Sequence, residues 1–257
     1  MSINSVGFIG AGRVTRIFLK AFENRNFRPK RIVVYDTNEQ VLGLLKSQFP
    51  DAETVSAPGE AASQDILFIA LHPPAIIDTL DMIKGIISKR SIVVSLAPKI
   101  SVAKMKGRLG TDNIARIIPN ATSYINEGYN PVCFADSFER SREEVLGIFE
   151  LLGNTFEVAE KKLEGYAIIS AMLPTYFWFQ WKTLEEIGEK TGLDKGEAAE
   201  AIYQTVVSSL NLLFKSGLDT DTVIDLIPVK PLGEEEEGIR KIYNDKLTAL
   251  FEKISPV

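Results

Sequence analysis

Val6-Gly-Phe-Ile-Gly-Ala-Gly-Arg-Val-Thr15 is the stretch of sequence that decides the fold. A short β-rich run at residues 6–9 passes directly into two glycines one residue apart, and a helix-like segment follows at residues 13–22. In such a turn the first glycine permits a tight bend, and the second lets a phosphate group approach backbone amides at the positive end of the helix. Thr15 stands where the usual pattern has a third glycine, so the motif depends on its context.

That context is a series of similar runs in the first half of the chain. Continuous apolar segments recur at residues 32–35, 66–71, 92–96 and 114–118. Apolar residues that do not alternate with polar ones suit strands covered on both faces of a parallel sheet. Helix-like stretches separate these runs, and the sequence therefore predicts a doubly wound α/β sheet of the Rossmann type.

The end of this domain is marked by a change of pattern. Residues 130–135 and 155–158 are expected to add strands, with a helix at 141–152 between them. Strand signals then vanish. We therefore predict a dinucleotide-binding Rossmann domain at residues 1–158 and an all-helical substrate and dimerisation domain at residues 159–257.

Two helices of the second domain carry recognisable ends. Asp194 and Glu197 make a capping box for a helix that runs towards Gly217, a suitable C-terminal glycine. Four acidic residues at 234–237 favour the positive end of a last helix, which continues to about residue 254.

One helix of this domain is apolar nearly all round. Tyr176-Phe-Trp-Phe-Gln-Trp181 exceeds what a single exposed helix face requires, so we expect it at the centre of a bundle or a dimer. Trp178 and Trp181 suit a core or an interface better than a substrate-stacking box. A homodimer through the carboxy-terminal helices is the predicted assembly.

Composition narrows the class of partner. A net charge of -5 over 257 residues gives no advantage in binding nucleic acid or anionic membrane. Cys133 and His72 are the only cysteine and histidine, so we predict no metal site, a buried inert thiol and a reducing, cytoplasmic location. No apolar run approaches the roughly 20 residues that span a bilayer. A small-molecule substrate is expected.

Asp36 follows the second predicted strand. A carboxylate at this place can accept hydrogen bonds from the adenosine ribose hydroxyls of a dinucleotide, and it would repel a 2′-phosphate. Asp36-Thr37-Asn38 could equally form a strand-to-loop turn with no ligand. Thr37 and Asn38 could also bind a phosphate if Asp36 turned away, so the choice between NADP and NAD stays open.

A longer motif carries a resemblance to a known family. Arg116-Ile-Ile-Pro-Asn-Ala-Thr-Ser-Tyr-Ile-Asn-Glu-Gly128 resembles the pyrroline-5-carboxylate reductase family, whose stretch reads Arg-x-Met-Pro-Asn-Thr-Pro with a glycine a few residues on. The order and spacing of further matches hold along the chain: the early Gly-x-Gly, His72-Pro73 where the family has Lys-Pro, Ser95-Leu-Ala97, Pro174, Tyr176 and Gln204-Thr-Val-Val207.

Two segments depart from the family's pattern. Ala171-Met-Leu173 stands where the family has Gly-Ser-Gly, and Pro228-Val-Lys-Pro-Leu-Gly233 replaces its Ser-Pro-Gly-Gly-Thr-Thr loop. The resemblance implies that these segments hold the substrate carboxylate through backbone amides and hydroxyls. A carboxylate buried without such donors costs several kcal/mol. Lys230 could offer a point charge instead, or it could be an ordinary exposed loop lysine.

Motif and resemblance together assign the site. Catalytic roles are expected for Asn120, His72 and Lys230. Asn120 together with Pro119 would border the nicotinamide and substrate, and His72 could donate a proton. A structural or solvent-facing histidine and an ordinary Pro-Asn turn are the alternatives. The expected cofactor contacts are Gly10, Ala11, Gly12, Arg13, Val14, Asp36, Thr37, Leu71, His72, Pro73 and Asn120.

These assignments predict an NAD(P)-dependent oxidoreductase that transfers hydride to a C=N or C=O bond of a small molecule. The cofactor carries this chemistry, so no conspicuous catalytic triad is needed. The altered segments favour a changed substrate. True pyrroline-5-carboxylate reductase with a rebuilt clamp and a non-catalytic dinucleotide-binding protein are the two alternatives.

Overall fold

A computed structural model describes residues 3–256 of the chain. The chain forms two compact units: one comprises the residues up to Met172 together with those from Leu250 onward, and the other is Leu173–Ala249. The predicted division at residue 158 is one of function and stays a prediction.

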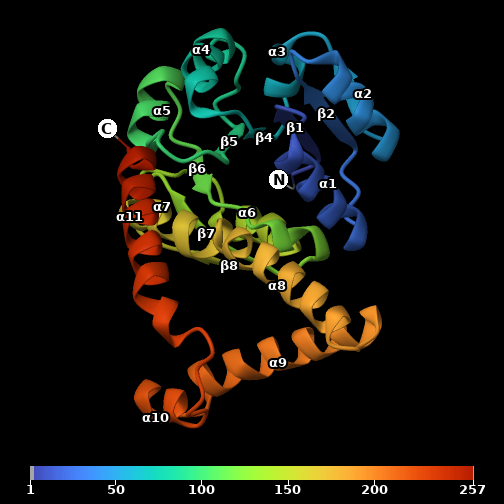
Figure 1. Ribbon diagram of the computed structural model, residues 1–257. Coiled ribbons are helices and arrows are strands. Elements are labelled where there is room, and N and C mark those ends of the chain that lie inside the picture. Colours follow the sequence, from blue (N-terminus) through green and yellow to red (C-terminus); the bar gives the residue numbers. More distant parts are fainter. Residues whose placement is uncertain (1–2, 257) are drawn as a thin grey trace. The chain divides into compact units, whose positions relative to one another are not determined.

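The first unit is built on one sheet, which confirms the predicted Rossmann-type fold (Figure 1). Within residues 3–256 the strand order is β3-β2-β1-β4-β5-β6-β7-β8, and each neighbouring pair is parallel except β6 with β7. The strands are β1 (Ser5–Ile9), β2 (Arg31–Tyr35), β3 (Glu53–Val55), β4 (Ile66–Ile69), β5 (Ile92–Ser95), β6 (Ile114–Ile117), β7 (Gly128–Phe134) and β8 (Gly153–Glu157).

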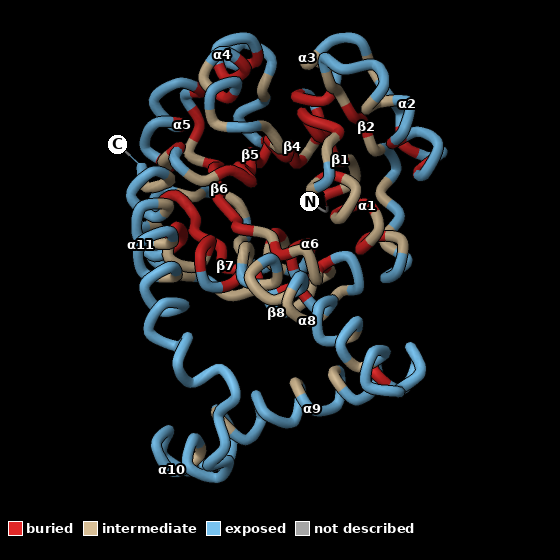
Figure 2. The backbone as a smooth tube through the Cα atoms, viewed as in Figure 1, coloured by how far each residue is buried: buried red, intermediate tan, exposed pale blue. Residues whose placement is uncertain are grey.

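Helices cover both faces of the sheet, which explains the unbroken apolar runs. In β4, Ile66 and Phe68 pack into one core, and Leu67 and Ile69 pack into the other. The strand is buried along its length (Figure 2). The first core is closed by α1 (Arg13–Asn24), α2 (Glu39–Gln48) and α6 (Arg142–Phe149), and the second by α3 (Pro58–Ala62), α4 (Pro73–Ile83) and α5 (Val102–Leu109).

Three features of this sheet were not predicted. β3 and α3 carry too short an apolar pattern to be recognised from the sequence. β7 pairs antiparallel with β6. The segment that joins them holds only the short helix η1 (Ala121–Ile125), which is too brief for the crossover connection that a parallel strand needs. α3 packs so closely on β1 that a Cβ atom at Gly7 would lie 2.0 Å from the Ala61 carbonyl oxygen.

The chain after β8 is helical, as predicted. The short helices η3 (Glu160–Lys162), α7 (Leu163–Tyr166) and the π-helical η4 (Ala167–Ala171) complete the first unit, apart from the end of α11. The others are α8 (Leu173–Lys190), α9 (Lys195–Lys215), α10 (Thr220–Asp225), η5 (Gly233–Glu235) and α11 (Glu236–Ile254). None of the helices among residues 3–256 is long and apolar enough to cross a membrane.

The predicted helix ends in the second unit are largely correct. The Asp194 carboxylate accepts the Glu197 backbone N–H at 2.9 Å, and the Glu197 carboxylate accepts the Asp194 N–H at 2.8 Å, which confirms the capping box. α9 ends at Lys215 with Ser216 as its capping residue, and Gly217, directly after the cap, adopts the left-handed φ of +80° that suits a C-terminal glycine.

The second unit lacks a core of its own. Among residues 173–249 only Ala198 is buried. Large apolar side chains are instead exposed, including Phe214 at 74% and Val229 at 73%. No residue of α8 is buried, so residues 176–181 do not lie at the centre of a bundle within the single chain, and their place at the centre of a dimer stays a prediction.

A buried ion-pair network fastens the helical end of the first unit to its sheet. The guanidinium of Arg116, fully buried in β6, donates to Glu160 at 2.8 Å and to Glu164 at 2.5 Å. The same two carboxylates accept the backbone N–H groups of Val102 at 2.7 Å and Lys99 at 3.4 Å. One guanidinium therefore joins β6, the β5–α5 loop and α7.

Glu164→Ala is expected to lower the free energy of unfolding by about 3–5 kcal/mol, because it leaves the buried Arg116 charge without its most buried partner. Urea denaturation followed by circular dichroism measures the change. Glu157→Ala is the matched control: Glu157 pairs with Arg142 where both side chains are exposed, so its loss should cost no more than about 1 kcal/mol. Equal losses in the two variants would contradict the assignment.

Candidate functional site

The glycine-rich turn after β1 is held between two neighbouring strands. The Gly10 N–H donates to the Tyr35 carbonyl at 2.7 Å, and the residue has φ +104°. A Cβ atom at this position would lie 2.3 Å from the Ala70 carbonyl oxygen. Both the backbone conformation and the close approach to β4 therefore require glycine here.

Gly12 has a different reason to be glycine. Its φ of −69° suits any residue, and a Cβ atom there would meet nothing within 4 Å. No side chain caps α1, and its first turn holds no acidic residue. Arg13 is exposed and Val14 is half-buried beside the opening. The fold thus leaves open space before uncapped backbone amides, which is what a phosphate group needs.

Thr15 explains the missing third glycine. It is fully buried, and its hydroxyl donates to the Gly10 carbonyl at 2.5 Å. The threonine therefore satisfies a carbonyl inside the turn. It leaves the outer surface of the turn unchanged.

Asp36 is brought against the same turn. One carboxylate oxygen accepts the Ala11 N–H at 2.7 Å, and the other accepts the Asn38 N–H at 2.9 Å. The Asn38 side chain accepts the N–H groups of Gln40 and Val41 and so caps α2. Thr37 is exposed. The turn predicted as an alternative at this position does form, and it holds the carboxylate beside the glycine turn.

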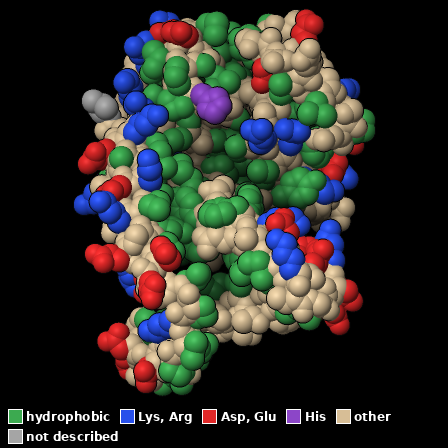
Figure 3. All heavy atoms as spheres, viewed as in Figure 1, with side chains coloured by type: hydrophobic (Ala, Val, Ile, Leu, Met, Phe, Trp, Pro, Cys, Tyr) green, Lys and Arg blue, Asp and Glu red, His purple; other side chains and the backbone are tan. Residues whose placement is uncertain are grey.

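Leu71, His72 and Pro73 follow β4 at the carboxyl edge of the sheet. Leu71 and Pro73 are half-buried, and the exposed His72 precedes α4 as its capping residue. His72, the purple side chain in Figure 3, lies on a face rich in hydrophobic side chains. It borders a cavity of about 420 Å³ whose other walls include Pro98, Lys99, Ile100 and Lys104.

Lys99 also lies at this edge, and it was not predicted from the sequence as a site residue. It has φ +75°, a backbone conformation that favours glycine, and its N–H points to Glu164 at 3.4 Å. Non-glycine residues in this region are uncommon and concentrate at binding sites. No motif signals it, because the left-handed conformation depends on the Glu160–Glu164 anchor and not on local sequence.

Asn120 is buried, and its side chain is already engaged. Its amide nitrogen donates to the Ser170 carbonyl at 2.9 Å and hydroxyl at 3.2 Å, and its oxygen accepts the Thr122 N–H and hydroxyl. The Asn120 backbone N–H donates to Asn130. The residue therefore ties the loop after β6 to η4. In this state it supports the site and offers no free polar atom to a substrate, so its catalytic role stays a prediction.

The two segments that depart from the family pattern have few donors to offer. The Met172 N–H is used by the Ala167 carbonyl at 3.0 Å, inside a π-helical turn. In the second unit, the loop from Pro228 to Gly233 is exposed throughout. The Lys230 side chain has no hydrogen bond or ion pair within residues 3–256, and its role stays a prediction.

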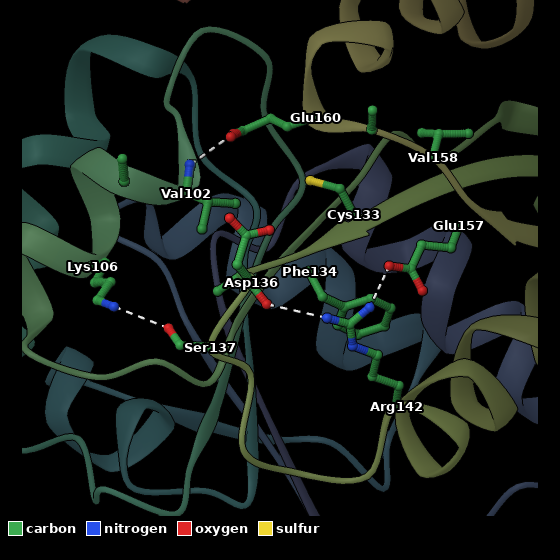
Figure 4. Close-up of a pocket in the computed structure, with 13 residues that line it drawn as sticks. Val102, Lys106, Cys133, Phe134, Asp136, Ser137, Arg142, Glu157, Val158 and Glu160 are labelled. Atoms are coloured by element: carbon green, nitrogen blue, oxygen red, sulfur yellow. Dashed lines mark hydrogen bonds and ion pairs between the residues drawn. The ribbon is translucent and has the colours of Figure 1, made fainter.

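A larger cavity, of about 750 Å³, lies between α5, β7 and the end of β8 (Figure 4). The two cationic side chains that line this cavity already have partners: Lys106 contacts Asp112 and Ser137, and Arg142 pairs with Glu157 at 2.5 Å. Burial raises the pKa of the Cys133 thiol to about 12, which keeps this cavity-lining side chain protonated at neutral pH. None of the predicted site residues lines this cavity.

The structure therefore brings some of the predicted site residues close together. Gly10, Ala11, Gly12 and Asp36 form one hydrogen-bonded cluster. His72 joins a cavity with Lys99, a residue that sequence reasoning missed. Across residues 3–256 no group of three or more His, Cys, Asp or Glu residues could hold a metal ion.

Known proteins with similar sequences share one activity in their names. Residues 5–99 match the family model described as NADP oxidoreductase coenzyme F420-dependent. A pyrroline-5-carboxylate reductase of Escherichia coli is 26% identical over 259 residues, covering 96% of each chain. Pyrroline-5-carboxylate reductase 2 of Bacillus subtilis is 23% identical, covering 95% of this chain and 88% of the relative.

Solved structures show the same fold over almost the whole length. The pyrroline carboxylate reductase of Plasmodium falciparum, with NADP bound, superposes with a TM-score of 0.73 at 21% identity, covering 99% of this chain and 95% of that one. The reductase of Coxiella burnetii gives a TM-score of 0.70 at 24% identity. Sequence motifs, full-length matches and fold agree in their similarity to the pyrroline-5-carboxylate reductases, and the chain is an NAD(P)-dependent oxidoreductase.

Proposed function

We propose that the protein transfers hydride from NADH or NADPH to a C=N or C=O bond of a small molecule other than pyrroline-5-carboxylate. The dinucleotide would lie across the carboxyl edge of β1, β2 and β4, against the glycine turn. Its proposed contacts are Gly10, Ala11, Gly12, Arg13, Val14, Asp36, Thr37, Leu71, His72, Pro73 and Asn120.

One observation carries the cofactor assignment. Gly12 has an ordinary backbone conformation and open space where a Cβ would stand, so the fold itself does not require glycine. The uncapped first turn of α1 faces the same opening. These residues fit a pyrophosphate, whose negative charge the helix N-terminus stabilises.

The bound nicotinamide supplies the hydride, and the chain has three tasks around it. The glycine turn and Asp36 fix the adenosine and pyrophosphate end. Asn120 holds the loop after β6 in one conformation through Ser170, and so fixes one wall. His72 is exposed at the cavity edge, where its ring could donate the proton that the reduced C=N or C=O group requires.

The substrate proposal rests on the two altered segments. The family resemblance implies a carboxylate clamp where this chain has Ala171, Met172 and Leu173. The Met172 N–H is consumed within the helix, and Leu173 adds an apolar side chain. A substrate carboxylate there would lose its hydration without gaining enough donors. A less polar imine or ketone avoids that cost.

Gly12→Val should leave stability almost unchanged and weaken NADH binding by about a hundredfold or more, because a side chain would enter the space proposed for the pyrophosphate. Fluorescence titration with NADH and thermal denaturation measure the two effects. Gly107→Ala in α5 is the control, since its Cβ also meets open space but lies away from the turn. Unchanged NADH affinity in Gly12→Val would refute the assignment.

A carboxylate-free cyclic imine such as 1-pyrroline should be reduced with kcat/KM about a hundredfold above that of pyrroline-5-carboxylate, given the several kcal/mol at stake. Spectrophotometric oxidation of NADH and NADPH measures both. Preference for pyrroline-5-carboxylate, lost in Lys230→Ala but kept in the control Lys241→Ala, would mean a rebuilt clamp in a true pyrroline-5-carboxylate reductase. Cofactor binding without turnover of any imine or ketone would identify a non-catalytic protein.

A homodimer through the second unit completes the proposal. The helices α8, α9 and α11 bury almost none of their apolar side chains, and the loop at Val229 and Leu232 is exposed and apolar as well. Exposed apolar surface on this scale marks an interface. A second copy supplies a matching apolar surface by symmetry. A cytoplasmic location, suggested by the single cysteine, also stays a proposal.

Phe214→Glu is expected to weaken dimerisation by about 2 kcal/mol or more, as for an apolar anchor residue, and to shift the protein towards monomer in analytical ultracentrifugation. Leu44→Glu, at an exposed apolar position on α2, should leave the dimer intact. A native protein that sediments as a monomer at micromolar concentration would rule out this assembly.

A further inference from the structure

We infer that Asp36 makes the protein select NADH over NADPH by excluding the 2′-phosphate. This inference rests on the proposed function, because it takes the dinucleotide to lie against the glycine turn. It goes beyond that proposal, in which either cofactor serves.

The first step is that the Asp36 carboxylate is held in place from both sides. Its two oxygens accept the backbone N–H groups of Ala11 and Asn38 at 2.7 and 2.9 Å. If the side chain turned away, both N–H groups would lose this acceptor, and for the Ala11 N–H, at a part-buried site, the loss is unfavourable. A 2′-phosphate therefore cannot displace the carboxylate without breaking the turn that holds the pyrophosphate.

The second step is that the residues next to Asp36 offer a 2′-phosphate few hydrogen-bond donors and no positive charge. The Asn38 side chain is already engaged as the cap of α2. Glu39, the first residue of that helix, adds a second negative charge. Residues 36–45 contain no lysine or arginine. Only the exposed hydroxyl of Thr37 remains, and one neutral donor does not offset repulsion from two carboxylates.

The third step concerns the ribose itself. At the end of β2, a carboxylate fixed by backbone N–H groups still has lone pairs that can accept hydrogen bonds from ribose hydroxyls. The same group that repels a 2′-phosphate thus favours a 2′-hydroxyl. Arg13, exposed at the first position of α1, is a cation of the glycine turn and would serve the pyrophosphate that both cofactors share.

The test compares the dissociation constants of NADH and NADPH, measured by fluorescence titration of the full-length protein. NADPH should bind at least about tenfold more weakly than NADH at low salt, and the ratio should narrow as salt screens the repulsion. Asp36→Asn keeps an oxygen that can accept the Ala11 N–H but removes the charge. It should lower the NADPH-to-NADH ratio of dissociation constants about tenfold, mainly by tightening NADPH.

Gln40→Ala, at an exposed and uncharged position in the first turn of α2, is the control and should leave the ratio unchanged. Thermal denaturation shows whether Asp36→Asn is folded, and the salt dependence of the native protein tests the repulsion without any variant. Equal or tighter binding of NADPH by the native protein overturns the inference and leaves the dinucleotide site standing. Binding of neither cofactor overturns the proposed function and the inference together.

Discussion

The close approach of β1 to β4 at Gly10 is the constraint on which the rest of the site depends. With φ +104° and the Ala70 carbonyl at the place of its missing Cβ, Gly10 turns the chain sharply at the sheet edge. That turn directs the Ala11 N–H towards Asp36 and leaves the first amides of α1 uncapped. A larger residue would separate β1 from β4 and move the turn away from Asp36. One backbone contact thus sets both the phosphate position and the carboxylate beside it.

A second constraint acts at β6, further along the same edge of the sheet. Arg116 is buried in β6 and must keep its carboxylate partners, because an unpaired buried charge is strongly unfavourable. Glu160 and Glu164 in turn accept the N–H groups at the start of α5 and at Lys99. The loop beside His72 is therefore positioned by an ion pair that touches no ligand. The arginine that begins the motif at 116–128 thus has a structural role inside the protein.

The sequence was informative where physical causes are local. Strands covered on both faces need continuous apolar residues, so β1, β2, β4, β5 and β6 were predicted close to their observed bounds. β3 was not predicted, because a three-residue edge strand with two exposed positions has no such pattern. The glycine turn and Asp36 were predicted from their order along the chain. The engaged state of Asn120 and the left-handed Lys99 were not, because both depend on contacts with residues 164–170, far away in sequence.

The two units differ in how completely they are packed, and this bears on the substrate preference proposed for the protein. The Rossmann unit has a complete core, so its cofactor edge can be preorganised within one chain. The helical unit buries only Ala198, and in the proposed dimer it would pack against the second copy. The exposed Val229 and Leu232 in its loop are therefore not constrained by an internal core, whereas Met172 packs against the second core of the Rossmann unit. Changes in such an exposed loop cost little folding free energy, because surface positions contribute little to stability. A new substrate preference is more easily acquired there than a new cofactor preference at Asp36, where both carboxylate oxygens are already part of the turn.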